Sequence, residues 1–253
     1  MRHISATIIT FNEEHRIKAC LASLDGIADE IIVVDSFSTD RTAEICIEHG
    51  CKVVRREFTG YGAQRQFATS LTTHSYVLSI DADEVLSPAL RSTIQHLKET
   101  GFDHRVYRMS RLNFYCGQPV RHCGWYPDIQ IRLFDKRYAN WNLRDVSERV
   151  IFPDSLRPEM LDGDILHYRC TTPEEYRQVQ TRHAAITGKV LSAHHDSISP
   201  VTPYIKGVTA FLDCYLNKGA ILDGAEGRAI SREQYRMAYL AYNLARRALK
   251  KAR

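Results

Sequence analysis

The stretch Tyr76-Val77-Leu78-Ser79-Ile80-Asp81-Ala82-Asp83-Glu84 joins a short apolar run to a group of acidic residues. Residues 76–80 have the length and apolar character of one buried strand. Two carboxylates, Asp81 and Asp83, follow with a single residue between them. Hard cations such as Mg²⁺ and Mn²⁺ take oxygen ligands and keep part of their coordination shell for substrate phosphates. The stretch therefore predicts a divalent-metal site that holds a diphosphate, and the alternative is an acidic turn after a strand.

Strands and helices alternate upstream of this stretch. Strands are expected over residues 5–10, 30–35 and 52–55, and a segment with helical spacing of apolar residues follows each of them. Asn12 and the two glutamates after it are expected to cap the first helix. Alternation of this kind, with nearly continuous apolar strands, indicates a parallel sheet covered by helices on both faces.

Ligands of such sheets bind beyond the carboxyl ends of the strands. The side chains that fall at these ends are polar or acidic, namely Thr10, Asn12, Asp35, Asp81, Asp83 and Glu84. The sequence therefore predicts the functional site at this edge.

The second half of the sheet is expected to be mixed or antiparallel. A helix over residues 88–99, capped by Ser87, is followed by strands without long helices between them. These strands are expected at residues 106–114, 129–134, 148–152 and 164–168. The predicted fold is α/β, a mixed sheet flanked by helices, with a core over residues 1–170 and a helical C-terminal region over residues 171–253.

The C-terminal region ends in a basic segment. Its charged residues are Arg246, Arg247, Lys250, Lys251 and Arg253. Such a segment is either a solvated helix end or, together with the C-terminal helices, a peripheral contact with an anionic membrane. Both interpretations stay open at this point.

The composition limits which partners the protein can have and in which cellular compartment it is expected. The chain has 253 residues and a net charge of +4, without the concentrated basic patch that a nucleic-acid partner needs. It has seven cysteines and no Cys-x-x-Cys pair, and the spacing of Cys116, His122 and Cys123 fits no common zinc pattern. No secretory apolar region and no apolar run of about 20 residues is present. We expect a cytoplasmic protein, peripheral on the inner face of the cell membrane if the basic segment binds lipid.

Four blocks in the N-terminal half carry a family resemblance. They are Thr10-Phe11-Asn12-Glu13, Val34-Asp35-Ser36-Phe37-Ser38-Thr39-Asp40-Arg41-Thr42, Gly62-Ala63-Gln64-Arg65 and Asp81-Ala82-Asp83-Glu84. In this order they resemble the family 2 inverting glycosyltransferases, which have the Rossmann-like GT-A fold.

Three further blocks resemble a narrower branch, the bacterial lipopolysaccharide core glycosyltransferases of the beta-1,4-glucosyltransferase type. They are residues 122–128 (HCGWYPD), 162–167 (DGDILH) and 218–224 (KGAILDG). One departure is Val146-Ser147-Glu148, where that branch usually has Val-His-Glu, so the family's histidine is replaced by Ser147 here.

The resemblance implies roles for individual residues. Thr10, Asn12, Glu13 and Asp35 would hold the nucleoside of the donor, and Arg65 would approach its diphosphate. Asp81 and Asp83 would position the divalent metal, with His167 as a C-terminal metal or phosphate ligand. The default donor is linked to uridine diphosphate. Taken singly, these residues also suit ordinary structural roles such as a cap, a turn carboxylate, a surface arginine or a buried histidine.

Inverting transfer also needs a base that takes the proton of the acceptor hydroxyl. Asp128 follows an aromatic and proline-containing segment that would present its carboxylate to a sugar. Glu148 is the alternative, with Asp145 close by, and Glu84 is expected to support the metal pair. Asp128 could instead cap the strand that starts after it.

The function predicted from these residues is transfer of a sugar from a nucleotide-diphosphate sugar to a hydroxyl of a lipopolysaccharide-core or other lipid-linked glycan acceptor. Two alternatives remain. One is a sugar-phosphate nucleotidyltransferase, although a glycine- and lysine-rich N-terminal phosphate loop is missing from the sequence. The other is a catalytically silent module that binds a glycan or a membrane surface, which has no physical need for Asp81, Asp83 and Asp128.

Overall fold

The computed structural model describes residues 2–143 and 148–251. Contacts divide the chain into two compact units. One, the sheet unit, contains the residues up to Arg111 together with Asp128–His167; the other, the helical unit, contains Leu112–Pro127 together with the residues from Tyr168 onward. The helical unit thus includes a segment from the middle of the chain. The division at residue 170 that the sequence suggests stays a prediction about domains.

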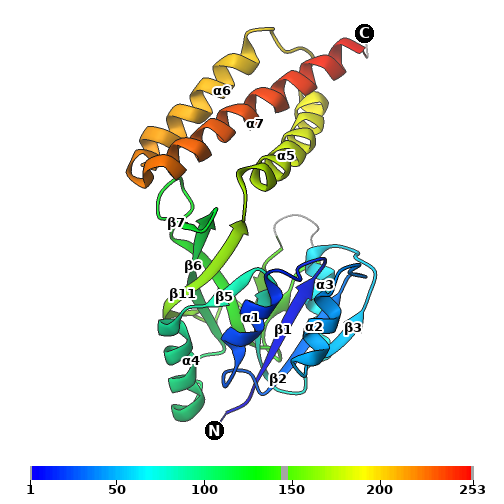
Figure 1. The fold of residues 1–253 in the computed structure, drawn as a ribbon, viewed down its shortest axis with the longest axis vertical. Helices are drawn as coiled ribbons and strands as arrows, with labels where there is room; N and C mark the ends of the chain where they lie inside the picture. The colour runs from blue at the N-terminus through cyan, green and yellow to red at the C-terminus, as the bar shows by residue number, and fades with distance from the viewer. Residues whose placement is uncertain (1, 144–147, 252–253) are drawn as a thin grey trace. The chain divides into compact units, whose positions relative to one another are not determined.

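The first four strands of the sheet unit are parallel (Figure 1). In the order β3-β2-β1-β4 they are Lys52–Arg55, Glu30–Asp35, Ile4–Thr10 and Tyr76–Asp81. The connecting helices are α1 (Ile17–Leu24), α2 (Thr42–Glu48) and α3 (Tyr61–Ser70). This arrangement confirms the alternation expected from the apolar spacing.

The remaining strands make the sheet mixed, as predicted. Next to β4 lies β8 (Asp128–Asp135), antiparallel to it, followed by β6 (Val106–Tyr115), β11 (Glu159–Cys170) and β5 (Glu84–Leu86), while β7 (Gln118–Val120) pairs with β6. β9 (Asn140–Trp141) and β10 (Val150–Ile151) form a separate antiparallel pair. The α/β fold expected from the sequence, a mixed sheet flanked by helices, is confirmed.

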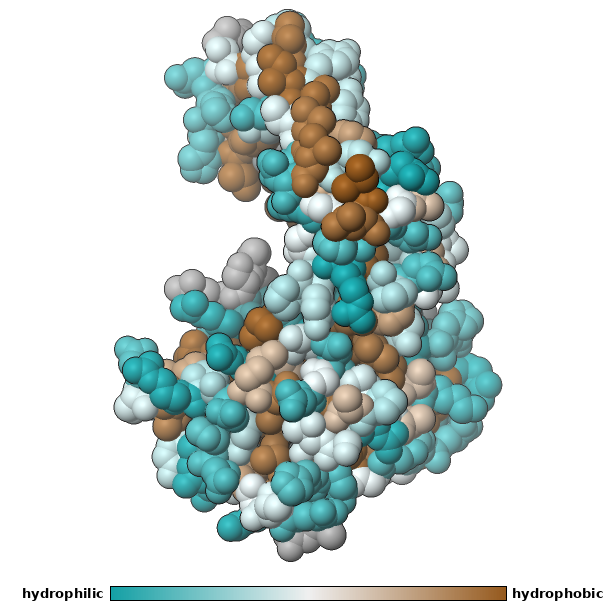
Figure 2. Space-filling view, turned by 90° about the vertical axis from the view of Figure 1, so that its left-hand side faces the viewer, coloured by the Kyte–Doolittle hydropathy of each residue, from teal (hydrophilic) through white to brown (hydrophobic). Residues whose placement is uncertain are grey.

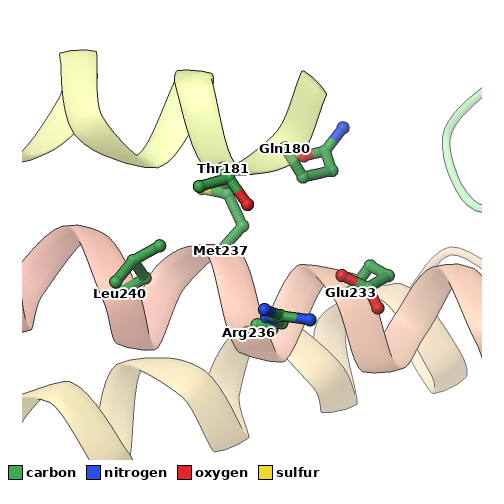
Figure 3. A pocket seen from close by; sticks show the side chains of 6 residues that line it. All are labelled: Gln180, Thr181, Glu233, Arg236, Met237 and Leu240. Atoms are coloured by element: carbon green, nitrogen blue, oxygen red, sulfur yellow. The ribbon is translucent and has the colours of Figure 1, made fainter. Parts of the chain in front are cut away.

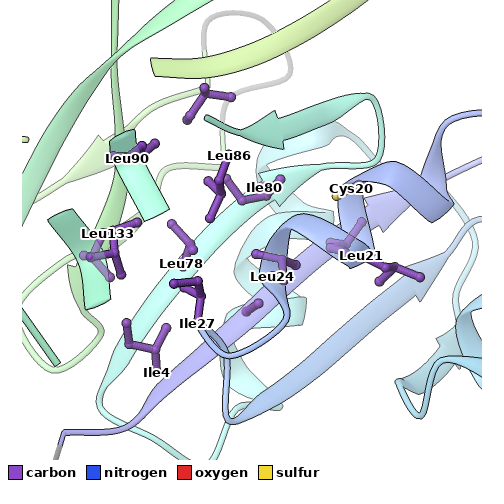
Figure 4. Packing of buried hydrophobic residues seen from close by; sticks show 14 of the residues in the cluster. Ile4, Cys20, Leu21, Leu24, Ile27, Leu78, Ile80, Leu86, Leu90 and Leu133 are labelled. Atoms are coloured by element: carbon purple, nitrogen blue, oxygen red, sulfur yellow. The ribbon is translucent and has the colours of Figure 1, made fainter. Parts of the chain in front are cut away.

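The core of the sheet unit follows from the two-residue period of its strands. Ile4 of β1 and Leu78 and Ile80 of β4 point to the same side and pack with α1 residues such as Leu21 (Figure 4). Ile8 of β1 belongs to the same buried cluster. The opposite side of the sheet has a second cluster, which includes Val77, Phe134 and Trp141. Because both sides of the sheet are covered, even the polar residues within these strands, Ser5, Thr7 and Ser79, are buried.

Helix α4 (Pro88–Thr100) begins as the sequence predicts, with the Ser87 hydroxyl accepting a hydrogen bond from the Leu90 amide at 3.2 Å. The start of this helix lies against β11 at Gly163. A Cβ atom on Gly163 would come within 2.3 Å of the Leu90 nitrogen, and its φ of +100° also disfavours any other residue. The Asp-Gly-Asp block at residues 162–164 therefore has a packing role.

The helical unit consists mainly of three long segments. Helix α7 (Gly224–Lys251) packs against both α5 (Pro173–His194) and α6 (Thr202–Leu212), as Figure 1 shows. A π-helical turn, Asp213–Asn217, and a 3-10 turn, Ala220–Asp223, connect α6 to α7. Among the described residues, none of the helices combines the length and the apolar character that a membrane span requires.

Two of the blocks that resemble the narrower branch meet inside the helical unit. The carboxylate of Asp223 accepts hydrogen bonds from the amides of Arg121 and His122, at 3.2 and 2.9 Å, and contacts the His122 ring at 2.9 Å. The Cys123 amide donates to the Lys218 carbonyl at 2.9 Å. These contacts give both blocks a structural role, because they hold the loop at residues 121–124 against the turn before α7.

Candidate active site

The carboxyl ends of β1, β2 and β4 bring three predicted residues to one edge of the sheet. The register places Thr10 opposite Asp35 and Ile9 opposite Asp81. Thr10 and Asp35 are buried, whereas the Asp81 side chain retains 19% exposure. This is the edge at which parallel sheets bind their ligands.

Asn12 and Glu13 join the loop after β1 to the loop after β2. The Asn12 amide donates to the Ser38 hydroxyl at 2.9 Å, and its side-chain oxygen accepts from the Thr39 amide at 2.8 Å. The Glu13 amide donates to the Thr42 hydroxyl at 2.8 Å. Helix α1 starts only at Ile17 and has no side-chain cap, so the expectation that Asn12 and the glutamates cap it is wrong. Asn12 and Glu13 instead bond to the loop after β2.

Asp35 organises the second loop from a buried position. Its carboxylate accepts from the amide and hydroxyl of Ser38, and Arg55 lies 3.8 Å away. Phe37, which lies between Asp35 and Ser38 in the sequence, is 54% exposed. Its φ is +62°, a value that a bulky residue rarely adopts. Phe11, in the neighbouring loop, is 56% exposed. Two aromatic rings therefore face solvent in the loops that follow β1 and β2.

A continuous chain of ion pairs runs along the edge of the sheet unit. Arg65 of α3 contacts both Asp81 oxygens, at 2.7 and 2.9 Å, and Glu148 at 2.6 Å. Arg132 of β8 bridges Asp81 and Glu84, at 3.0 and 2.9 Å.

The chain of ion pairs continues from Glu84 to the predicted base. Arg111 of β6 contacts Glu84 at 3.0 Å and Asp128 at 2.7 Å. Gln130 donates to the other Asp128 oxygen at 2.6 Å. Asp81, Asp128 and Glu148 thus belong to one electrostatic network, although they lie far apart in the sequence.

Burial and neighbouring charges shift the pKa values of this network in opposite directions. Burial disfavours the ionised form of Asp81, but Arg132 and Arg65 outweigh it and hold the pKa of the carboxyl well below its usual range. Burial likewise opposes the charge of Arg132, whose pKa is nevertheless raised by Asp81 and Glu84. Both groups are therefore charged near neutral pH.

Several donors of the network have no hydrogen-bond partner within the described ranges. They are Nε of Arg65, Nε and Nη1 of Arg132, and Nε1 of Trp141. The Trp141 ring lies beneath the two guanidinium groups, whose carbon atoms are 4.8 and 5.7 Å from its centroid. Buried donors without partners are rare in folded proteins, so these donors are candidates for contacts with a bound anion.

Asp83 has a different partner from Asp81. Its carboxylate lies 3.2 Å from Nε2 of His167, and the two side chains are 24% and 13% exposed. In the part of the chain that the structure describes, no group of three or more His, Cys, Asp or Glu residues is arranged to hold a metal. A carboxylate and an imidazole are nevertheless suitable donors for a cation that completes its shell with phosphate oxygens. The pair fits a divalent metal bound together with a diphosphate.

The two base candidates occupy opposite ends of the ion-pair chain. Asp128 starts β8 and is 28% exposed, while Glu148 is 23% exposed beside Arg65. Asp145 and Ser147 lie outside the described residues. The geometry thus leaves the choice between Asp128 and Glu148 as a prediction.

Arg111, Arg132 and Trp141 are site residues that the sequence pattern did not predict. One signal was present: Arg132 interrupts the apolar run Ile131 to Phe134, and a charged residue in a buried strand needs partners. The sequence does not show which residues are the partners of Arg132, because Asp81 and Glu84 are remote from it in the chain. A small pocket between α5 and α7, lined by Gln180, Glu233 and Arg236 among others, contains none of the predicted site residues (Figure 3).

Comparisons with known proteins agree on one family. The model of "Glycosyl transferase family 2" matches residues 5–148. An uncharacterized glycosyltransferase of Rickettsia typhi is 34% identical over 191 residues, which make up 69% of this chain and 63% of that protein. The lipopolysaccharide core biosynthesis glycosyltransferase LpsC of Rhizobium meliloti is 28% identical over 72% of this chain and 69% of its own length.

Among solved structures, glucosyl-3-phosphoglycerate synthase of Mycobacterium tuberculosis, in complex with Mn²⁺, uridine diphosphate and glucosyl-3-phosphoglycerate, is 27% identical. The match covers 45% of this chain and 44% of that protein, with a TM-score of 0.37.

Proposed function

Because the chain belongs to glycosyltransferase family 2, we propose that it moves a sugar from a nucleotide-diphosphate sugar to a hydroxyl group, with inversion at the anomeric carbon. The observation that carries this proposal is the pairing of two features at one sheet edge. Arg65 and Arg132 have donors to spare for an anion, and Asp83 and His167 form a donor pair for a cation. A metal-bound diphosphate needs both.

In this scheme the loops after β1 and β2 hold the nucleoside. Thr10, Asn12, Glu13 and Asp35 shape this part of the site, and the exposed ring of Phe11 offers a face on which a base can stack. A uridine nucleotide is the default donor. The similarity to a relative named for lipopolysaccharide core biosynthesis supports an acceptor of that class, or another lipid-linked glycan.

Asp83 and His167 would hold a divalent metal, Mg²⁺ or Mn²⁺, with Asp81 anchoring the turn that carries Asp83. When bound, the metal neutralises charge on the leaving diphosphate. Arg65 would donate to the same diphosphate. Both of its terminal nitrogens are bonded to carboxylates, so a phosphate oxygen would either accept from Nε, which has no partner among the described residues, or displace Glu148 or Asp81.

The acceptor hydroxyl requires a base, for which we propose Asp128, with Glu148 as the alternative. Arg111 and Gln130 orient the Asp128 carboxylate through contacts of 2.7 and 2.6 Å. Fixed orientation lets a carboxylate accept the proton as the new bond forms.

The test is incubation of the full chain with Mn²⁺ and a panel of uridine-diphosphate sugars, with a truncated lipopolysaccharide as acceptor. We expect release of free nucleoside diphosphate and a product of inverted anomeric configuration by NMR. Consumption of pyrophosphate would favour the nucleotidyltransferase alternative. Binding of donor without turnover on any acceptor would favour the silent module.

A further inference from the structure

Helix α6 and the turn after it carry a stripe of exposed apolar side chains. We define the α6 stripe as Val201, Ile205, Val208, Leu212 and Leu216, which recur at intervals of three or four residues and are 45–58% exposed. The spacing places them along one face. In Figure 2 a brown, hydrophobic band crosses the helical unit in the upper part of the view.

The stripe is not the face by which α6 packs in the helical unit. That face contains Pro203 and Gly207, both buried, and a Cβ atom on Gly207 would come within 2.8 Å of the Tyr235 ring of α7. A surface helix ordinarily has polar residues opposite its buried face. Helix α6 is apolar on both sides, and a contiguous exposed apolar surface marks an interaction site.

The net charge of the segment that carries the stripe indicates the kind of partner. Residues 176–251 contain twelve Lys and Arg against five Asp and Glu, a net charge of +7, whereas the whole chain has +4. The rest of the chain therefore has a net charge of −3. Within α6 the only charged residue is Lys206, and Asp213 in the following turn is paired with Lys218 at 2.7 Å.

We propose that the α6 stripe docks the protein on the surface of an anionic lipid bilayer. Apolar side chains would enter the boundary between headgroups and acyl chains, and the Lys and Arg residues within residues 176–251 would be attracted to anionic headgroups. Association of two copies through the stripe would bring two segments of charge +7 together, which the charge disfavours. The proposal does not depend on the transfer reaction, so either can fail without the other.

Cosedimentation of the full chain with vesicles tests this surface. The stripe variant is Ile205→Ser/Val208→Ser/Leu212→Ser, and the matched control, Ile47→Ser/Leu143→Ser/Ile151→Ser, removes three exposed apolar residues from the sheet unit. We expect binding to vesicles of phosphatidylcholine with phosphatidylglycerol, weaker binding at high salt, and little binding to phosphatidylcholine alone. The stripe variant should bind at least about tenfold more weakly, with the control unchanged.

Equal vesicle binding by the stripe variant and the wild type would overturn the proposal. So would light scattering that finds a wild-type dimer and a monomeric stripe variant, without vesicle binding by either, because the stripe would then be a contact between copies. A variant with Arg246, Arg247, Lys250 and Lys251 changed to Ala separates the sources of attraction. If it alone loses binding, the basic segment and not the stripe holds the lipid. Thermal unfolding of each variant verifies that it is folded.

Discussion

Asp81 and Asp83 are two residues apart, yet their carboxylates have different partners. Asp81 is held by two arginines, whereas Asp83 lies beside a histidine. A carboxylate with both oxygens bonded to guanidinium groups is a poor choice for a metal ligand, since each bond would have to be replaced. We therefore infer that Asp83 is the main metal ligand and that Asp81 positions it.

Asp83→Ala should remove metal-dependent nucleotide binding and leave the fold intact, because the side chain is partly exposed and supports no core. Thermal shift with uridine diphosphate, with and without Mn²⁺, measures this, since a ligand of the native state raises its stability. The control is Asp103→Ala, at an exposed site of the same unit. An Mn²⁺-dependent shift as large as that of the wild type would contradict the prediction.

Asp128→Asn should lower turnover by about 10²–10⁴-fold, the usual effect of losing general acid–base help, while affinity for donor and metal stays near the wild-type value. The amide keeps the size of the side chain and removes its basicity. Steady-state kinetics and donor titration separate the two effects. Should Asp128→Asn remain nearly active and Glu148→Gln lose turnover with donor binding intact, the roles of the two residues must be exchanged.

Arg132→Met should lower the free energy of unfolding by about 3 kcal/mol, because it leaves Asp81 and Glu84 buried with one cationic partner fewer each. Urea unfolding measures the change. Arg41→Met, which breaks an exposed pair with Glu44, is the matched control and should leave stability nearly unchanged. A similar loss in both variants would mean that burial of the network is not the cause.

At the scale of elements, glycines determine where segments approach closely. Gly163 lets β11 pass the first turn of α4, and Gly227 lets α7 start against the turn before it, where a Cβ atom would lie 1.8 Å from the Ala220 oxygen. Both positions belong to packing contacts between elements. Neither glycine is among the residues that we propose for catalysis or for binding of the donor.

Gly163→Ala should lower the free energy of unfolding by more than the strain of a positive φ accounts for. A φ of +100° or more strains an alanine by about 1–3 kcal/mol, and at Gly163 the clash with Leu90 adds to it. Gly101→Ala, at a φ of +114° with open space around the Cβ position, isolates the strain. Urea unfolding of both variants should give the larger loss for Gly163→Ala, and equal losses would refute a packing role.

At the scale of the whole molecule, the ion-pair network around Asp81 makes the free energy of unfolding depend on pH. The pKa of Asp81 in the folded state lies below its unfolded value of about 3.9. Its ionised form therefore contributes stability that is fully present above that value and is lost as the pH falls toward the folded pKa.

We accordingly expect the urea midpoint to be nearly constant from neutral pH to about pH 5 and to fall below about pH 4. The fall should be shallower in Arg132→Met, where part of the pKa shift is gone. A midpoint that rises on acidification through pH 4 would contradict this assignment.

The sequence by itself determined the alternating elements, the mixed sheet and the edge at which Thr10, Asp35 and Asp81 meet. These features depend on the local spacing of apolar residues and on the rule that parallel strands share a carboxyl edge. Such information is contained within each segment.

Only the tertiary structure decided which charges pair. Arg111 and Arg132 reach Glu84 and Asp81 because β6 and β8 pass close to β4 and β5, a matter of register between segments separated by more than 25 residues. The exposure of the α6 stripe was decided in the same way. The apolar period of α6 is visible in the sequence, but which of its two apolar faces α7 covers depends on how the helices pack.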